Sequence, residues 1–68
     1  MNQIVLRIGS RTSEFYFPQS EIGFLGIEEV IHDITHNQDE VNEAVEWCKG
    51  ASLGDKLLKE KFNLEIRA

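Results

Sequence analysis

The residues best suited to chemistry are two histidines four positions apart, His32 and His36, in the segment His-Asp-Ile-Thr-His. On a helix this spacing places both imidazoles on one face, where they can bind a transition metal such as zinc. A working metal site also needs further ligands and groups that orient them. The neighbouring carboxylates, Glu28 and Glu29, hold no special position, and two surface histidines beside acidic residues are the simpler interpretation. The sequence therefore predicts no metal or cofactor, with His32 and His36 as the one candidate pair.

Catalytic groups are equally hard to assemble. The histidine segment resembles the His-Glu-x-x-His motif of zinc proteases, but Asp33 stands where that motif has glutamate, and the chain has no third histidine. Cys48 falls on the apolar stripe of a predicted helix and has no histidine base, which favours a buried, inert thiol. The glycines precede no Gly-Lys-Ser/Thr sequence, so they form no phosphate-binding loop. We therefore expect a protein that is not an enzyme.

The most informative feature is the distribution of charge. Between Thr12 and Cys48 the chain carries nine carboxylates and no lysine or arginine, so this part has a formal charge of −9 and the two flanks together +4. Helix faces normally mix signs to gain pairs between residues i and i+4, and this stretch forgoes them. Rows of carboxylates can also imitate the phosphates of duplex DNA, which carries roughly one charge per 1.7 Å of its axis. The acidic balance argues against direct binding to nucleic acid or to an anionic membrane.

These charges define the predicted partner-binding site. It combines the acidic side chains of two successive helices with two apolar residues of the preceding loop: Glu28, Glu29, Asp33, Asp39, Glu40, Glu43, Glu46, Phe24 and Leu25. A second interpretation of the carboxylates is solubility alone. Phe24 and Leu25 either dock onto a partner or plug the open end of a small sheet. Trp47 either covers the edge of the core or anchors an interface.

Length and composition set the scale of the molecule. The 68 residues predict a single domain, 1–68, with one modest core. One cysteine permits no internal disulfide, and no apolar run approaches the roughly 20 residues of a membrane-spanning helix. The first residues lack the charged start and long apolar stretch of a secretion signal. We therefore expect a cytoplasmic protein.

Two strands are expected at the start of the chain. Apolar residues alternate over residues 3–8, which is typical of a strand with one buried face. Residues 9–12 are suited to a turn, and the aromatic segment 15–17 favours a second strand that Pro18 ends. The two strands form a hairpin that places on one face Ile4, Leu6, Ile8, Phe15 and Phe17.

Two helices follow. From residue 27 apolar residues recur at i, i+3, i+4 and i+7, the stripe of an amphipathic helix. Asn37 then offers an N-cap, and Glu40 can complete a capping box for a second helix with the same stripe. Gly50 is expected to close this helix in a left-handed conformation. For residues 19–26 the sequence leaves two alternatives, a loop buried under the domain and an exposed loop.

The end of the chain leaves one alternative open. Ser52 with Asp55 either caps a third short helix or joins a turn at Gly54, and the alternation over residues 62–66 predicts a final strand. The predicted fold is α+β, a small antiparallel three-stranded sheet in the order β-β-α-α-β. Two or three helices cover one face, and the last strand lies beside the first.

The last third of the chain resembles short uncharacterised proteins of phages and bacterial mobile elements. The residues concerned are Ala44 to Cys48, Gly54-Asp55, and the alternating Phe62, Leu64 and Ile66. The resemblance implies only that a compact acidic chain of this size acts on a host protein.

The sequence thus predicts a non-enzymatic interaction module whose acidic helical face, Glu28 to Glu46, docks onto a basic protein partner. A nucleic-acid-binding host enzyme is one candidate partner. One alternative is a structural subunit that self-associates, as a homodimer, through a sheet edge and the apolar 22–25 loop. Another is a metal-binding protein that uses His32 and His36.

Overall fold

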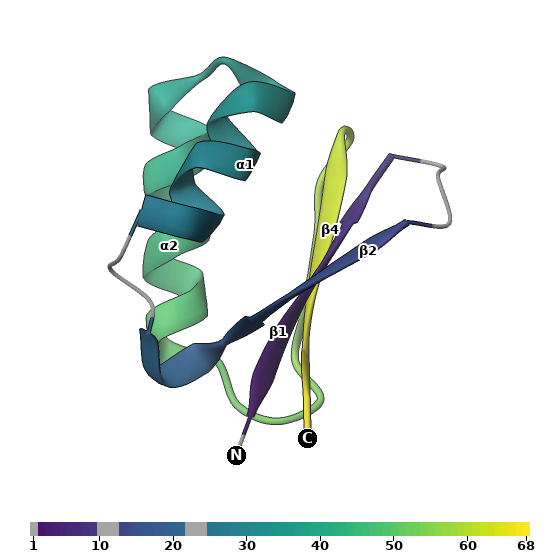
Figure 1. Cartoon of the computed structure of the whole chain (residues 1–68). Coiled ribbons are helices and arrows are strands. Elements are labelled where there is room, and N and C mark those ends of the chain that lie inside the picture. Colours follow the sequence, from purple (N-terminus) through teal and green to yellow (C-terminus); the bar gives the residue numbers. More distant parts are fainter. Residues whose placement is uncertain (1, 10–12, 22–24) are drawn as a thin grey trace.

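The computed structural model describes residues 2–9, 13–21 and 25–68. It contains four strands, β1 (Gln3–Ile8), β2 (Glu14–Pro18), β3 (Lys56–Leu58) and β4 (Phe62–Arg67), two helices, α1 (Leu25–Thr35) and α2 (Gln38–Gly50), and a short 3₁₀ turn, η1 (Gln19–Glu21). The strands form one antiparallel sheet in the order β2-β1-β4-β3. Both helices lie on the same side of it, so the α+β class is confirmed (Figure 1).

The middle of the sheet joins the two ends of the chain. As predicted, β4 pairs with β1, with Leu6 opposite Leu64 and Ile4 opposite Ile66. The hairpin register is also as predicted, because Ile4 lies opposite Phe17 and Leu6 opposite Phe15. Since side chains alternate along a strand, these apolar residues share the face that meets the helices.

The sheet has one strand more than expected. After a turn at Gly54, which has a φ of 91°, residues Lys56–Leu58 form β3 along the free edge of β4. The Gly54 amide donates to the Ile66 carbonyl at 2.9 Å, and the Ile66 amide donates to the Asp55 carbonyl at 3.0 Å. These bonds begin the pairing that β3 continues. Of the two alternatives for this segment, the turn is therefore correct and the third helix is wrong.

The two ends of α2 are held differently. At the start, the Asn37 side chain accepts hydrogen bonds from the amides of Asp39 and Glu40, which confirms the predicted N-cap. At the other end the expectation for Gly50 is wrong, because its φ is not positive and the chain leaves the helix through an extended Ala51. Instead, the side-chain amide of Gln19 donates to the carbonyl of Cys48, at 2.9 Å, and to that of Ala51, at 2.8 Å. A side chain of η1 thus satisfies carbonyls that a glycine cap normally serves.

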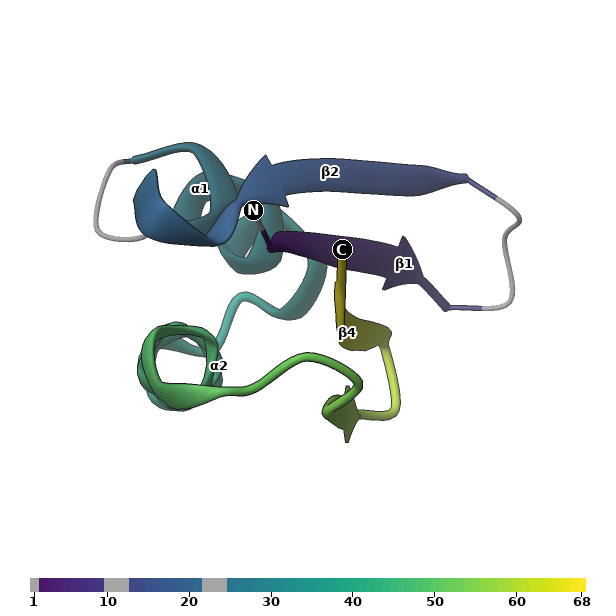
Figure 2. The same ribbon diagram turned by 90° about the horizontal axis from the view of Figure 1, so that it is seen from below.

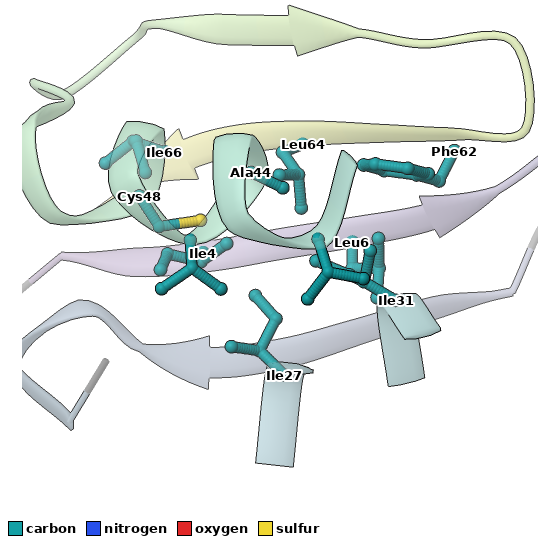
Figure 3. Close-up of a cluster of buried hydrophobic side chains, with 11 residues drawn as sticks. Ile4, Leu6, Ile27, Ile31, Ala44, Cys48, Phe62, Leu64 and Ile66 are labelled. Carbon is teal, nitrogen blue, oxygen red and sulfur yellow. The ribbon is translucent and has the colours of Figure 1, made fainter. Parts of the chain in front are cut away.

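The core lies between the helices and the sheet. Figure 2 shows α1 beside the β1–β2 half of the sheet and α2 beside the β4 half. Ile27 and Ile31 of α1 and Ala44 and Cys48 of α2 are buried, and they point toward strand residues that include Leu6 and Leu64 (Figure 3). Trp47 is half-buried and packs against this cluster, in agreement with the core-edge interpretation. Within the described part of the chain, no helix has the length and apolar character needed to cross a bilayer.

Candidate functional site

The predicted acidic residues lie on the solvent-facing sides of the two helices. Because the apolar stripes of α1 and α2 face the sheet, the carboxylates between them face solvent. Five of these side chains are exposed, and Glu28 and Glu40 are partly buried. We call this surface the acidic layer; it consists of Glu28, Glu29 and Asp33 on α1 and of Asp39, Glu40, Glu43 and Glu46 on α2.

Few cations reach the acidic layer. The Lys59 ammonium lies 2.8 Å from a carboxylate oxygen of Glu43, and the Lys49 ammonium lies 3.6 Å from one of Glu46. Both carboxylates are more than half exposed, and pairs of this kind contribute only about 0–1 kcal/mol. Across residues 2–9, 13–21 and 25–68 no other lysine or arginine pairs with the layer. Most of its charge therefore stays open to a partner.

A groove runs through the acidic layer where α1 meets the start of α2. Its volume is about 460 Å³, and its lining residues are Glu28, Glu29, His32, Asp33, Gln38 and Val41. We call it the acidic groove. Carboxylate and amide oxygens in such a concave site can accept hydrogen bonds from lysine or arginine, and a charged donor makes these bonds stronger.

The two predicted histidines lie at the end of α1. Helix α1 ends at Thr35, and His36 follows it with a φ of 53°, its amide donating to the His32 carbonyl at 2.9 Å. This left-handed position closes many helices and usually holds glycine or asparagine. The two rings stand edge to face, with centroids 6.2 Å apart. His36 therefore lies just beyond the helix although its ring stays close to that of His32, and within the described residues no group of three or more histidine, cysteine or acidic side chains is placed to hold a metal ion.

The loop half of the predicted site lies outside the described residues. This holds for Phe24 and for most of the 22–25 loop, while Leu25 is described only as the first residue of α1. The predicted site therefore reduces, in the structure, to the acidic layer.

The opposite face of the sheet carries a second polar cluster that sequence reasoning missed. Neither helix covers this face (Figure 2). Glu14 on β2 accepts hydrogen bonds from Arg7 on β1 and from the Tyr16 hydroxyl, at 2.6 Å, and Arg67 on β4 approaches it to 3.4 Å. Val5 of β1 is only 3% exposed, although no helix covers this face of the sheet. The pairing of Arg7 with Glu14 follows from the hairpin register, which was the signal available in the sequence.

These contacts shift the ionisation of the groups involved. Hydrogen bonds from Tyr16 and Arg7 stabilise the charged form of Glu14 and lower its pKa from 4.5 to about 2. The same bond raises the pKa of Tyr16, because ionised tyrosine could not donate to the carboxylate. Glu65 raises the pKa of Arg67 in turn.

The Glu14 cluster predicts a measurable pH dependence. Because the folded-state pKa of Glu14 is depressed, its contribution to stability is present above about pH 4.5 and is lost as the pH falls toward 2. Replacing Tyr16 with phenylalanine removes the largest cause of this shift, so we expect the Glu14 pKa to rise. The loss of stability that Glu14 causes in acid should then become smaller and should be complete at a higher pH. Carboxyl-detected NMR titration from pH 7 to pH 2 measures the Glu14 pKa in the wild type and in the Tyr16→Phe variant. Lys56→Gln, on the same face of the sheet, should leave the Glu14 titration unchanged; a Tyr16→Phe curve that overlays the wild type would contradict the assignment.

Comparison with known proteins leaves the geometry as the basis for a functional assignment. The likeness of the last third of the chain to phage and mobile-element proteins stays a prediction from the sequence. The chain matches no family model, no curated protein and no solved structure.

Proposed function

We propose that this protein is a non-enzymatic interaction module whose acidic layer docks onto a basic surface of another protein. The observation that carries the proposal is the set of carboxylates without a lysine or arginine partner among the described residues: Glu28, Glu29, Asp33, Asp39 and Glu40. Same-sign charges on one surface add their fields and steer a partner of opposite charge. A host enzyme that binds nucleic acid fits as a partner, because it already has a cationic surface that holds phosphates.

The rigidity of the helical layer supports this proposal. Asn37 caps the start of α2, Gln19 holds its end, and the apolar stripes of both helices are buried against the sheet. The carboxylates therefore project from a fixed scaffold, which lowers the entropy lost on binding.

Affinity capture from bacterial lysate tests the proposal when two variants of equal charge change are compared. Glu29→Gln with Glu40→Gln removes two charges from the acidic layer, and Asp55→Asn with Glu65→Gln removes two from elsewhere. We expect the first pair to weaken binding of the retained partner about tenfold and the second to have little effect, since two lost charge pairs amount to roughly 1.4 kcal/mol. Retention should also fall as salt rises, because screening shortens the range of the field.

Two results would count against this function. One is a retained partner whose binding is the same at low and high salt. The other is an equal loss of binding in the two double variants, which would show that the position of the charges does not matter.

One observation favours self-association as an alternative. Strand β2 forms an edge of the sheet, and its Phe15 and Tyr16 are 41% and 54% exposed. Unpaired strand edges can join a second copy of the same chain. Sedimentation across a range of concentrations separates the two functions, since a dimer that persists at high salt supports the sheet edge and a monomer at every concentration excludes it.

A further inference from the structure

An apolar groove lies on the other side of α1, between this helix, the end of β1, the start of β2 and the turn between β3 and β4. Its volume is about 750 Å³. We call it the apolar groove; four apolar side chains and two carboxylates contribute to its lining, namely Ile8, Phe15, Val30, Ile34, Asp33 and Glu60. Ile8, Val30 and Ile34 are half-buried and Phe15 is exposed, so the core leaves part of their apolar surface in water.

The backbone holds the apolar groove open. Gly9 has a φ of 53°, and its amide donates to the Lys61 carbonyl at 2.8 Å. This bond fastens the end of β1 to the turn between β3 and β4, and both Gly9 and Lys61 line the groove. One part of the wall opposite α1 is therefore fixed by a backbone contact within the folded chain.

Asp33 connects the apolar groove with the acidic groove, because it lines both. Val30 and Ile34 lie on one side of α1, and Glu28 and His32 lie on the other. A segment that crosses α1 would therefore meet an apolar site and an acidic site in succession. The distance between them is about one helix diameter, roughly 10–12 Å with side chains. An extended chain spans this in about three residues, at roughly 3.3 Å each.

We propose that the docking segment of the basic partner carries a large apolar side chain that fills the apolar groove, about three residues from the lysines or arginines that bind the acidic groove. The inference rests on the proposed function and names the chemistry of the partner. Charge complementarity supports it, because the charged residues that line the apolar groove are two carboxylates, Asp33 and Glu60, and one cation, Lys61. Interfaces commonly combine one buried aromatic or aliphatic anchor with polar contacts around it.

Two synthetic peptides test the inference with purified full-length protein. The first has one tryptophan three residues before three consecutive lysines, and the second has glycine in place of the tryptophan. We expect the tryptophan peptide to bind at least about tenfold more tightly, as is usual for a buried anchor. In methyl-detected NMR it should shift the signals of Ile8, Val30 and Ile34, whereas the glycine peptide should not.

Variants of the chain assign the tighter binding to the groove. Val30→Thr keeps the side-chain shape and replaces a methyl group with a hydroxyl at a half-buried position, so it should reduce the advantage of the tryptophan peptide. Phe15→Thr, at an exposed strand position, should reduce it further. Leu53→Thr, also exposed but not part of the groove lining, serves as the matched control, and circular dichroism verifies that each variant is folded.

The outcomes separate the two proposals. Equal affinity for both peptides, with binding that weakens at high salt, overturns the apolar anchor and leaves the acidic docking surface standing. In another outcome, the tryptophan peptide binds more tightly, and its affinity is unchanged by high salt and by the Glu29→Gln with Glu40→Gln variant. This result supports the groove and overturns the acidic docking. Absence of binding by either peptide at low salt overturns both.

Discussion

Replacing Phe62 with alanine is expected to lower the free energy of unfolding by about 3–5 kcal/mol. Phe62 is fully buried, begins β4 and lies opposite Ile8, and its carbonyl accepts a hydrogen bond from the Lys59 amide at 2.9 Å. Its ring fills the core where α1, β1 and β4 meet, and alanine would leave a cavity there. A domain of this size has a total stability of only about 3–10 kcal/mol. The variant should therefore be largely unfolded or close to it, which urea denaturation followed by circular dichroism measures.

Leu58→Ala provides the matched control in the same hairpin. Leu58 is 72% exposed and belongs to the edge strand β3, so we expect its loss to change the free energy of unfolding by less than about 0.5 kcal/mol. Similar losses in the two variants would mean that Phe62 is not part of a close-packed core.

The thiol of Cys48 is expected to react with Ellman's reagent at least about a thousandfold more slowly in the folded protein than in guanidinium chloride. The thiolate is the reactive form, and burial raises the pKa of Cys48 from 9.0 to about 12. At pH 8 this shift alone lowers the thiolate fraction about a thousandfold. The side chain is also fully buried, so the reagent must wait for the chain to open.

A second cysteine supplies the internal control. Ser52 is exposed just beyond α2, and the Ser52→Cys protein should show one fast thiol and one slow thiol in the same sample. Rapid labelling of both would show that Cys48 is accessible in the folded state. Slow labelling of both would mean that the rate does not report burial.

The regular elements could be predicted because each has a pattern within a few residues of sequence. Alternation marks β1 and β4, the four-point stripes mark α1 and α2, and Asn37 marks the start of a helix. The errors concern interactions with distant segments. Strand β3 exists because β4 offers it a free edge, and Gly50 needs no left-handed turn because Gln19 reaches the end of α2 from η1.

The candidate site divides in the same way, because its local features could be predicted from the sequence and its contacts between distant segments could not. The sign of the charges and their place on the outer side of the helices follow from the stripes, so the acidic layer could be named in advance. The ion pair of Lys59 with Glu43 could not be named, since these residues are 16 positions apart. The apolar groove was also missed, because it forms where the hairpin end, α1 and the β3–β4 turn meet.

The pairing of β1 with β4 has a consequence for biosynthesis. The first strand to leave the ribosome must wait for the last, because β1 lies between β2 and β4 at the centre of the sheet. A nascent chain that ends before Phe62 has both helices and the first hairpin but lacks the strand that supplies Leu64 and Ile66 to the core. Translation must therefore run almost to Arg67 before the domain can fold, and until then its apolar stripes stay available to chaperones.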